Sequence, residues 1–113
     1  MPIVMNMRWE GVTPEQYDAA RDTVHWEGDV PDGALYHVAA FDEWGTYVTD
    51  VWESAEQFQR FVETRLMPGV QAVGITGEPQ IEIRPAHAIF APGYRVELPP
   101  QRLSMTDTRS EVT

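Results

Sequence analysis

The sequence predicts a ferredoxin-like α+β fold, in which two strand-helix-strand halves build one four-stranded sheet with two helices. Two observations indicate this fold. The same helix-start signature occurs twice, as "TPEQY" at residues 13–17 and as "SAEQF" at residues 54–58. Segments rich in β-branched and aromatic residues precede, separate and follow these two starts. The predicted order is therefore strand-helix-strand-strand-helix-strand.

The first predicted strand, "IVMNMRW" at residues 3–9, leads into the first helix. Thr13 can accept a hydrogen bond from the amide of Gln16, and the Gln16 side chain can bond back to the Thr13 amide. Pro14 suits the first helical position because no N–H is needed there. The apolar stripe of this helix consists of Tyr17, Ala20 and Val24.

A hairpin of two strands follows, with "ALYHVAAF" at residues 34–41 and "TYVTDVW" at residues 46–52 joined by "DEWG". The second helix begins at the cap Ser54. Its apolar stripe consists of Phe58, Phe61, Val62 and Leu66. Pro68 is expected to end this helix or to start a new turn, with a short helical continuation after it. The fourth strand is predicted within "QIEIRPAHAIF", residues 80–90.

The length of 113 residues fits one domain, and we expect residues 1–92 to form it. In residues 93–113, the pair Pro99-Pro100 and a polar Ser/Thr run predict an extended or disordered tail. No apolar run approaches the roughly 20 residues that span a bilayer, and the N-terminus lacks the pattern of a secretory signal. We therefore expect a cytoplasmic protein that is not inserted in a membrane.

The composition excludes several kinds of chemistry and one class of partner. The chain has no cysteine, which rules out a disulfide framework and a thiol nucleophile. All eight basic residues are arginines, so no side chain can form a Schiff base. The formal net charge of −10 repels phosphate backbones, so nucleic acid is not an expected partner.

Both faces of the predicted sheet are substantially apolar, which predicts a homodimer. Two helices can cover only one face of a four-stranded sheet. The other face carries Tyr36, Val38, Ala40, Tyr47 and Val51 by strand alternation. The sheet of a second copy of the chain is the simplest cover for these side chains.

The hairpin brings a histidine and an aspartate together. A symmetric turn around "DEWG" pairs His37 with Asp50 and, one step along the same face, Leu35 with Trp52. Opposed residues on one face have Cβ atoms about 5 Å apart, within reach of a side-chain hydrogen bond. A bulged loop would shift this register by one residue and break the pair.

Such a pair has a chemical interpretation and a structural one. In the first, Asp50 orients His37 and sets its tautomer, and the other imidazole nitrogen takes a proton from a substrate. In the second, the pair only satisfies its own hydrogen bonds and holds the hairpin in register. Trp52, Tyr36 and Phe58 are candidate walls of a substrate cleft around it.

The other two histidines give weaker signals. His87 lies on or just beyond the fourth strand and is a further candidate for the substrate site. His37, Asp50 and His87 could also converge as a two-histidine, one-carboxylate metal site, although no short metal-binding spacing is present. His25 lies near the end of the first helix, where a surface role is expected. No Gly-rich phosphate loop recommends a nucleotide or a flavin.

Three stretches resemble the antibiotic-biosynthesis-monooxygenase-like family. "VTDVWESAEQFQRFVETRLMP" is similar to the third strand and second helix of these proteins, where "WES" leads into an "F..F" helix. "MPIVMNMRWEGVTPEQYDAAR" and "DGALYHVAAF" are similar to their first and second strands. The resemblance covers residues 1 to about 93 and implies a dimeric α/β barrel. Its best-understood members oxidise polycyclic phenols or quinols with O₂ and no cofactor, in a cleft between sheet and helices.

The same resemblance bears on individual residues. Trp52, within "WES", is the residue that carries over most clearly. The oxygenases of the family use an Asn, Trp, Arg and Tyr set, and Asn6 and Arg8 have suitable types. Strand alternation, however, puts Asn6 and Arg8 on the face opposite Met5 and Met7.

Two functional hypotheses follow. The first is a cofactor-independent monooxygenase, or a related isomerase or cyclase, acting on an aromatic or polyketide-like small molecule, with His37 as general base and Asp50 as its orienter. The second is a non-catalytic dimeric module that binds a small ligand and uses the His–Asp pair structurally. The opening beside His37 distinguishes them, since a sealed imidazole ring would favour the second.

Overall fold

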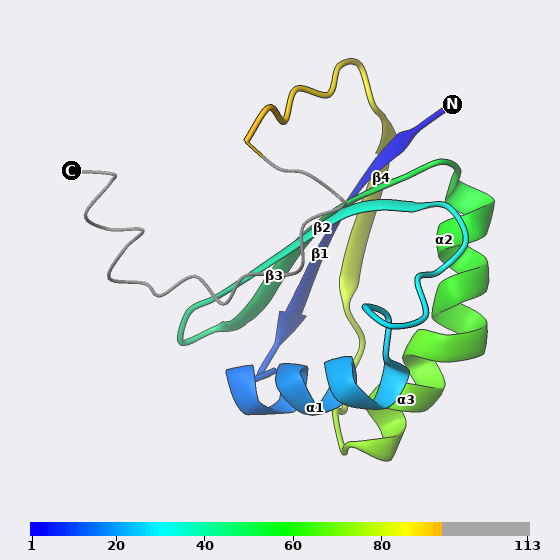
Figure 1. Cartoon of the computed structure of the whole chain (residues 1–113). Coiled ribbons are helices and arrows are strands. Elements are labelled where there is room, and N and C mark those ends of the chain that lie inside the picture. Colours follow the sequence, from blue (N-terminus) through cyan, green and yellow to red (C-terminus); the bar gives the residue numbers. More distant parts are fainter. Residues whose placement is uncertain (94–113) are drawn as a thin grey trace.

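The computed structural model describes residues 1–93, which form one sheet and a layer of helices (Figure 1). The strands are β1 (Ile3–Glu10), β2 (Ala34–Phe41), β3 (Gly45–Trp52) and β4 (Gln80–Pro85). The helical segments are α1 (Pro14–Val24), α2 (Ala55–Phe61), η1 (Val62–Leu66) and α3 (Met67–Ala72). The tail expected over residues 93–113 lies, apart from residue 93, outside the described residues.

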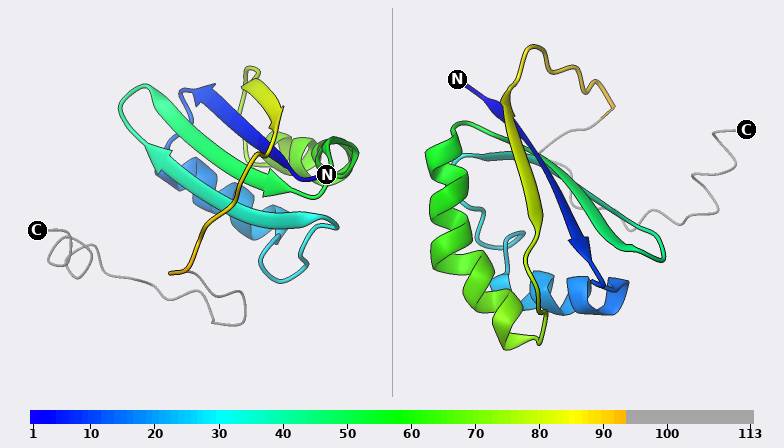
Figure 2. Two further views of the ribbon diagram at one scale, coloured as in Figure 1. Left: turned by 90° about the horizontal axis from the view of Figure 1, so that it is seen from above. Right: turned by 180° about the vertical axis from the view of Figure 1, so that it is seen from behind.

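The sheet has the strand order β2-β3-β1-β4 with every neighbouring pair antiparallel. This is the predicted ferredoxin-like topology, and α1 and the α2-η1-α3 run lie together on one face of the sheet (Figure 2). Side chains of β1 that point to this face alternate with exposed ones. The buried core between the two layers includes Met5, Met7, Trp9, Val48, Trp52, Phe58 and Val70.

The hairpin register pairs His37 with Asp50, as the symmetric turn predicted. The expected pairing of Leu35 with Trp52 is wrong. A bulge between Ala34 and Tyr36 leaves Leu35 as the extra residue, and Ala34 takes its place opposite Trp52. The bulge lies on the far side of the His–Asp pair from the turn, so the pair keeps its register.

Both helix starts use the predicted caps, although only the first forms the full reciprocal box. Thr13 accepts a hydrogen bond from the Gln16 amide, and the Gln16 side chain accepts one from the Thr13 amide. Ser54 caps the Gln57 amide in the same way. The Gln57 side chain instead accepts a bond from the Ser54 hydroxyl and reaches Asp32 in the preceding loop.

The second helical run does not end at Pro68, and the alternative expectation, a new turn with a short helical continuation, is confirmed. It continues through a π-helical segment into α3, with Pro68 near the start of α3, where a missing N–H is tolerated. The wide π turn is closed by the Met67 amide, which donates to the Val62 carbonyl. The fourth strand occupies Gln80–Pro85, within the predicted stretch of residues 80–90. Among the described residues, no helix is long and apolar enough to cross a membrane.

Candidate active site

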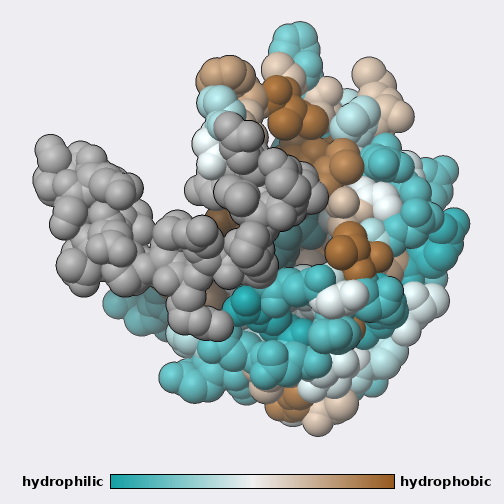
Figure 3. Space-filling view, in the orientation of Figure 1, coloured by the Kyte–Doolittle hydropathy of each residue, from teal (hydrophilic) through white to brown (hydrophobic). Residues whose placement is uncertain are grey.

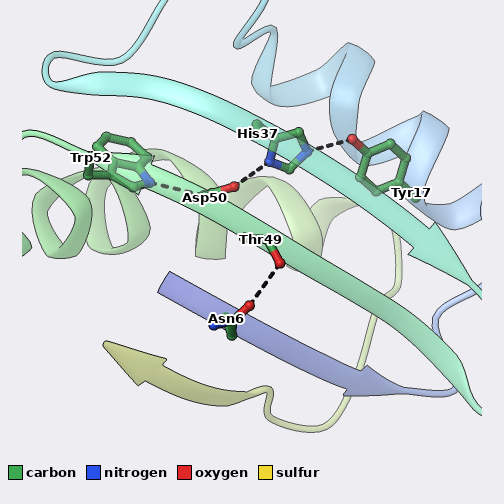
Figure 4. Close-up of polar contacts among 6 residues, drawn as sticks. All are labelled: Asn6, Tyr17, His37, Thr49, Asp50 and Trp52. Atoms are coloured by element: carbon green, nitrogen blue, oxygen red, sulfur yellow. Dashed lines mark hydrogen bonds and ion pairs between the residues drawn. The ribbon is translucent and has the colours of Figure 1, made fainter. Parts of the chain in front are cut away.

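Four side chains form one hydrogen-bonded line across the helix-covered face of the sheet (Figure 4). The Trp52 indole N–H donates to Oδ2 of Asp50 at 2.9 Å, and Oδ1 of Asp50 lies 2.7 Å from Nδ1 of His37. Nε2 of His37 lies 2.7 Å from the hydroxyl oxygen of Tyr17 on α1. Asp50 and Trp52 are buried, whereas the His37 side chain is 34% exposed.

The donors along this line set the tautomer of a neutral His37. Trp52 can only donate, so Asp50 accepts at one oxygen and, as a carboxylate, accepts at the other as well. The hydrogen of a neutral His37 therefore lies on Nδ1, facing Asp50. Nε2 is then an acceptor, and the hydroxyl of Tyr17 donates to it.

The helix start fixes the position of Tyr17. The capping box at Thr13 begins α1, which places Tyr17 on its inner face within the first turns. The phenol ring packs edge-on against Trp26 and Phe41, with ring centroids 5.7 and 5.5 Å away, and lies parallel to the His37 ring at 6.1 Å. Burial raises the pKa of Tyr17 to about 12, so its hydroxyl keeps its proton over the physiological pH range.

The raised pKa of Tyr17 predicts a loss of stability in alkali. The ordinary tyrosine value of about 10 applies to the unfolded chain, so between pH of about 10 and about 12 the unfolded state releases a proton that the native state holds. The free energy of unfolding should fall across this window and be unaffected by Tyr17 below it. Denaturant unfolding of wild type and Tyr17→Phe at a series of pH values measures the effect. Identical pH slopes in the two proteins would contradict it.

A cavity of about 310 Å³ lies between the sheet and the helices, and the Tyr17–His37–Asp50 line forms part of its wall. Its lining is mainly apolar and includes Trp52 and Phe58, whose rings meet edge-on at 5.5 Å. In the orientation of Figure 1, apolar surface is visible above the largely hydrophilic helix α1 (Figure 3). Such a cavity suits a flat apolar molecule that presents one polar group to the line.

The loop between α1 and β2 forms another wall of the cavity and brings Trp26 to 5.4 Å from the His37 ring. Two contacts hold this loop in place. Arg21 and Glu27 form a two-bond ion pair at 2.7 Å that spans the end of α1. Arg65 of η1 donates to the backbone carbonyls of Val24 and Asp29. These contacts hold the loop that places Trp26 beside the imidazole.

The structure brings some predicted site residues together and separates others. His37, Asp50, Trp52 and Phe58 border the cavity. Tyr36 borders the cavity at the bulge, although the pairing of Tyr36 with Val51 places this residue on the opposite face of the sheet. His87 is exposed beyond β4 and does not line the cavity.

The remaining predictions for the site concern a metal and three polar residues. The cluster of His37, Asp50 and His87 does not form, and no three His, Asp or Glu side chains within residues 1–93 meet in a metal-binding arrangement. His25 is the left-handed C-cap of α1, with φ of 64°, as its place at the helix end suggested. Asn6 and Arg8 lie on the helix-free face, where Asn6 accepts a hydrogen bond from Thr49 (Figure 4).

Sequence reasoning misses Tyr17 and Trp26 as site residues. The periodicity assigns Tyr17 to the apolar stripe of α1, where its ring does pack, but gives its hydroxyl no partner. A buried tyrosine hydroxyl needs a hydrogen-bond partner, and a tyrosine on a helix stripe that faces the sheet must find this partner on the sheet. This signal points from Tyr17 to His37. Trp26 lies in an irregular loop, where no periodicity shows which way a side chain points.

No protein-family model and no curated protein match the chain, whereas solved structures do. A Nitrosomonas europaea protein of unknown function is 18% identical, with a TM-score of 0.58 over 82% of this chain and 96% of its own. SnoaB, a cofactor-independent oxygenase from Streptomyces nogalater, is 14% identical, with a TM-score of 0.55 over 78% of this chain and 94% of its own. A dimeric ferredoxin-like protein of unknown function from Thermobifida fusca is 12% identical, with a TM-score of 0.53 over 76% and 92%.

A candidate antibiotic biosynthesis monooxygenase from Chloroflexus aurantiacus shares the fold as well. At these identities the likeness concerns the fold alone. The chain has the ferredoxin-like fold of the antibiotic-biosynthesis-monooxygenase-like proteins, as the sequence resemblance implied.

Proposed function

We propose that this protein is a cofactor-independent monooxygenase that acts on an aromatic or polyketide-like phenol, with the His37–Asp50 pair as its base. The observation that carries the proposal is the line from Tyr17 to Trp52 on the wall of an apolar cavity. A polar line along an otherwise apolar wall can orient a flat ligand and take the proton of one of its hydroxyl groups. The oxygenase among the structural neighbours supports the choice of reaction.

The chemistry needs only proton removal by the protein. Loss of the phenolic proton leaves an electron-rich anion in the cavity, and this anion supplies the electrons that O₂ receives. A ring carbon of the anion forms a bond to O₂, and loss of the C–H proton at that carbon with cleavage of the O–O bond leaves a carbonyl. The departing hydroxide takes up a proton to form water, so the substrate supplies all four electrons that reduce O₂. Asp50 accepts the hydrogen on Nδ1 at 2.7 Å and keeps this hydrogen bond when His37 also holds the transferred proton on Nε2.

Oxygen uptake with a polycyclic quinol tests the proposal. Wild type should consume O₂ in the presence of the quinol without added metal, flavin or haem, and His37→Ala should lose about 10²-fold or more in rate. Phe90→Ala is a matched control, because Phe90 is an exposed side chain away from the cavity. Equal rates for wild type and His37→Ala would remove His37 from the mechanism.

A related isomerase or cyclase is the second candidate, because a line of proton donors and acceptors can act on an enol without O₂. Substrate turnover under argon favours this candidate over the oxygenase. A purely structural role for the pair is less well supported, since the His37 side chain is 34% exposed and borders the cavity. We therefore propose a catalytic role over a non-catalytic binding module.

We further propose that the protein is a homodimer in which a second copy covers the helix-free face of the sheet (Figure 2). Tyr36 and Val38 on that face are large apolar side chains that are 37% and 45% exposed, and exposed apolar groups that lie together on a sheet face favour an interface. A stable homodimer interface buries about 2,000 Å² or more, which a four-stranded sheet face can supply. The cytoplasmic location expected from the sequence stays a prediction.

The substitution Val38→Asp is expected to dissociate this dimer. Val38 is exposed in the single chain, so a charge there costs little before association and much once it is buried against a partner. Light scattering at micromolar concentration should change from twice 12.9 kDa to 12.9 kDa. Val30→Asp is the matched control, because Val30 is 65% exposed in the loop between α1 and β2. A particle of 12.9 kDa for the unmodified chain would contradict the dimer.

A further inference from the structure

Both nitrogens of His37 already have partners. Nδ1 faces Asp50 and Nε2 faces the Tyr17 hydroxyl, each at 2.7 Å. The Tyr17 ring also borders the cavity. A ligand in the cavity therefore meets no open nitrogen on His37. It must either displace the Tyr17 hydroxyl or exchange protons through it.

We infer that Tyr17 is the catalytic residue that touches the ligand hydroxyl and passes its proton to His37. This inference rests on the proposed function and names the group that meets the substrate. Asp50 and Trp52 are then positioning residues, because Trp52 anchors one carboxylate oxygen and leaves the other for His37. Tyr17 is the end of the line that α1 contributes (Figure 4), and it borders the cavity.

The transfer balances with a single proton. The ligand O–H donates to the Tyr17 oxygen while the Tyr17 hydroxyl proton moves to Nε2 of His37. The products are a ligand oxyanion, a neutral Tyr17 that carries the ligand's proton, and a His37 imidazolium paired with Asp50. Tyr17 then donates a hydrogen bond to the oxyanion. No electrons are exchanged with the protein in this step.

A relay through a neutral phenol agrees with the electrostatics around Tyr17. Burial raises the pKa of Tyr17, so a tyrosinate that acts as the base itself is disfavoured. In the relay, Tyr17 gives up one proton as it gains another and never carries a charge. In the alternative route, the ligand displaces Tyr17 and bonds directly to His37. This route requires the Tyr17 side chain to leave its contacts with Trp26 and Phe41.

Anaerobic binding of 4-nitrophenol separates the two routes, because only its ionised form absorbs strongly in visible light. In wild type the bound probe should ionise at a lower pH than the free probe. In Tyr17→Phe this midpoint should rise by one pH unit or more, because the hydrogen bond to the oxyanion is lost. Direct contact with His37 predicts an unchanged or lower midpoint in Tyr17→Phe, and this result would overturn the relay.

Two controls keep the measurement specific. Tyr47→Phe removes a tyrosine hydroxyl on the helix-free face, next to Trp44, and should leave the midpoint unchanged. 4-Nitroanisole, which lacks the O–H group, should bind wild type and Tyr17→Phe equally within about threefold if the cavity is intact. Absence of probe ionisation in wild type would also overturn the relay. If the bound probe ionises under argon but the quinol causes no oxygen uptake in air, the oxygenase function is rejected and the relay is still supported.

A second measurement leaves Tyr17 in place. In the chain with ¹³C-labelled tyrosine rings, the Cζ signal of Tyr17 is assigned by exclusion, because Tyr36→Phe, Tyr47→Phe and Tyr94→Phe each remove one of the other three signals. Its shift should change when 4-nitrophenol is added and stay nearly constant when 4-nitroanisole is added. Equal changes with both ligands would overturn the inference even if Tyr17→Phe fails to fold.

Discussion

The substitution Asp50→Asn is expected to abolish the activity of the site by reversing the tautomer of His37. The Trp52 N–H donates to one oxygen of Asp50 and needs an acceptor there. In the Asp50→Asn variant the amide oxygen must therefore face Trp52, which turns the amide NH₂ toward Nδ1 of His37. His37 then moves its hydrogen to Nε2, the nitrogen that faces Tyr17. A loss of about 10²- to 10⁴-fold in rate follows, because the accepting nitrogen is gone.

The tautomer itself can be observed without an assay. In ¹⁵N-labelled protein, the protonated nitrogen of a neutral His37 should change from Nδ1 in wild type to Nε2 in Asp50→Asn. A second substitution, Trp52→Phe, serves as the control, because it removes the N–H donor that orients the amide of the Asp50→Asn variant. When Trp52→Phe is combined with Asp50→Asn, the amide can turn its oxygen to His37 and recover about tenfold or more of the lost rate. The same tautomer in wild type and Asp50→Asn would contradict the assigned line.

The substitution Gly45→Ala is expected to lower the stability of the fold more than a change at other glycines. Gly45 begins β3 and lies against the end of β1. A Cβ atom there would lie 2.2 Å from the Trp9 carbonyl oxygen and 2.9 Å from the Gly11 nitrogen. Both neighbours are backbone atoms, so neither can rotate away, and the cost should be about 3 kcal/mol or more. The melting temperature should fall by about 10 °C or more.

Gly74→Ala provides the comparison for Gly45→Ala. Gly74 has a left-handed φ of 84°, but a Cβ there would meet nothing within 4 Å. Its substitution should cost only the backbone strain, about 1–2 kcal/mol. Thermal unfolding of both variants tests whether the contact of the new Cβ with backbone atoms or the backbone conformation contributes more to the loss of stability at Gly45. A smaller loss for Gly45→Ala than for Gly74→Ala would show that the hairpin end can shift to make room.

Local sequence signals determined the order of elements and the His37–Asp50 pair. Helix caps act over three residues, so Thr13 and Ser54 mark both helix starts without any knowledge of the rest of the fold. The hairpin register depends on the turn and on the two-residue alternation of strands, which are also local. The opposition of His37 and Asp50, and the same-face position of Trp52, follow from these rules alone.

Only the tertiary structure decided which other side chains contact the His37–Asp50 pair. Tyr17 reaches His37, 20 residues further along the chain, because α1 packs over β2, and no short-range pattern encodes that packing. The Leu35 bulge and the backbone contact at Gly45 depend in the same way on neighbours distant in sequence. Periodicity tells which face a side chain is on, whereas contact between layers decides which atom it meets.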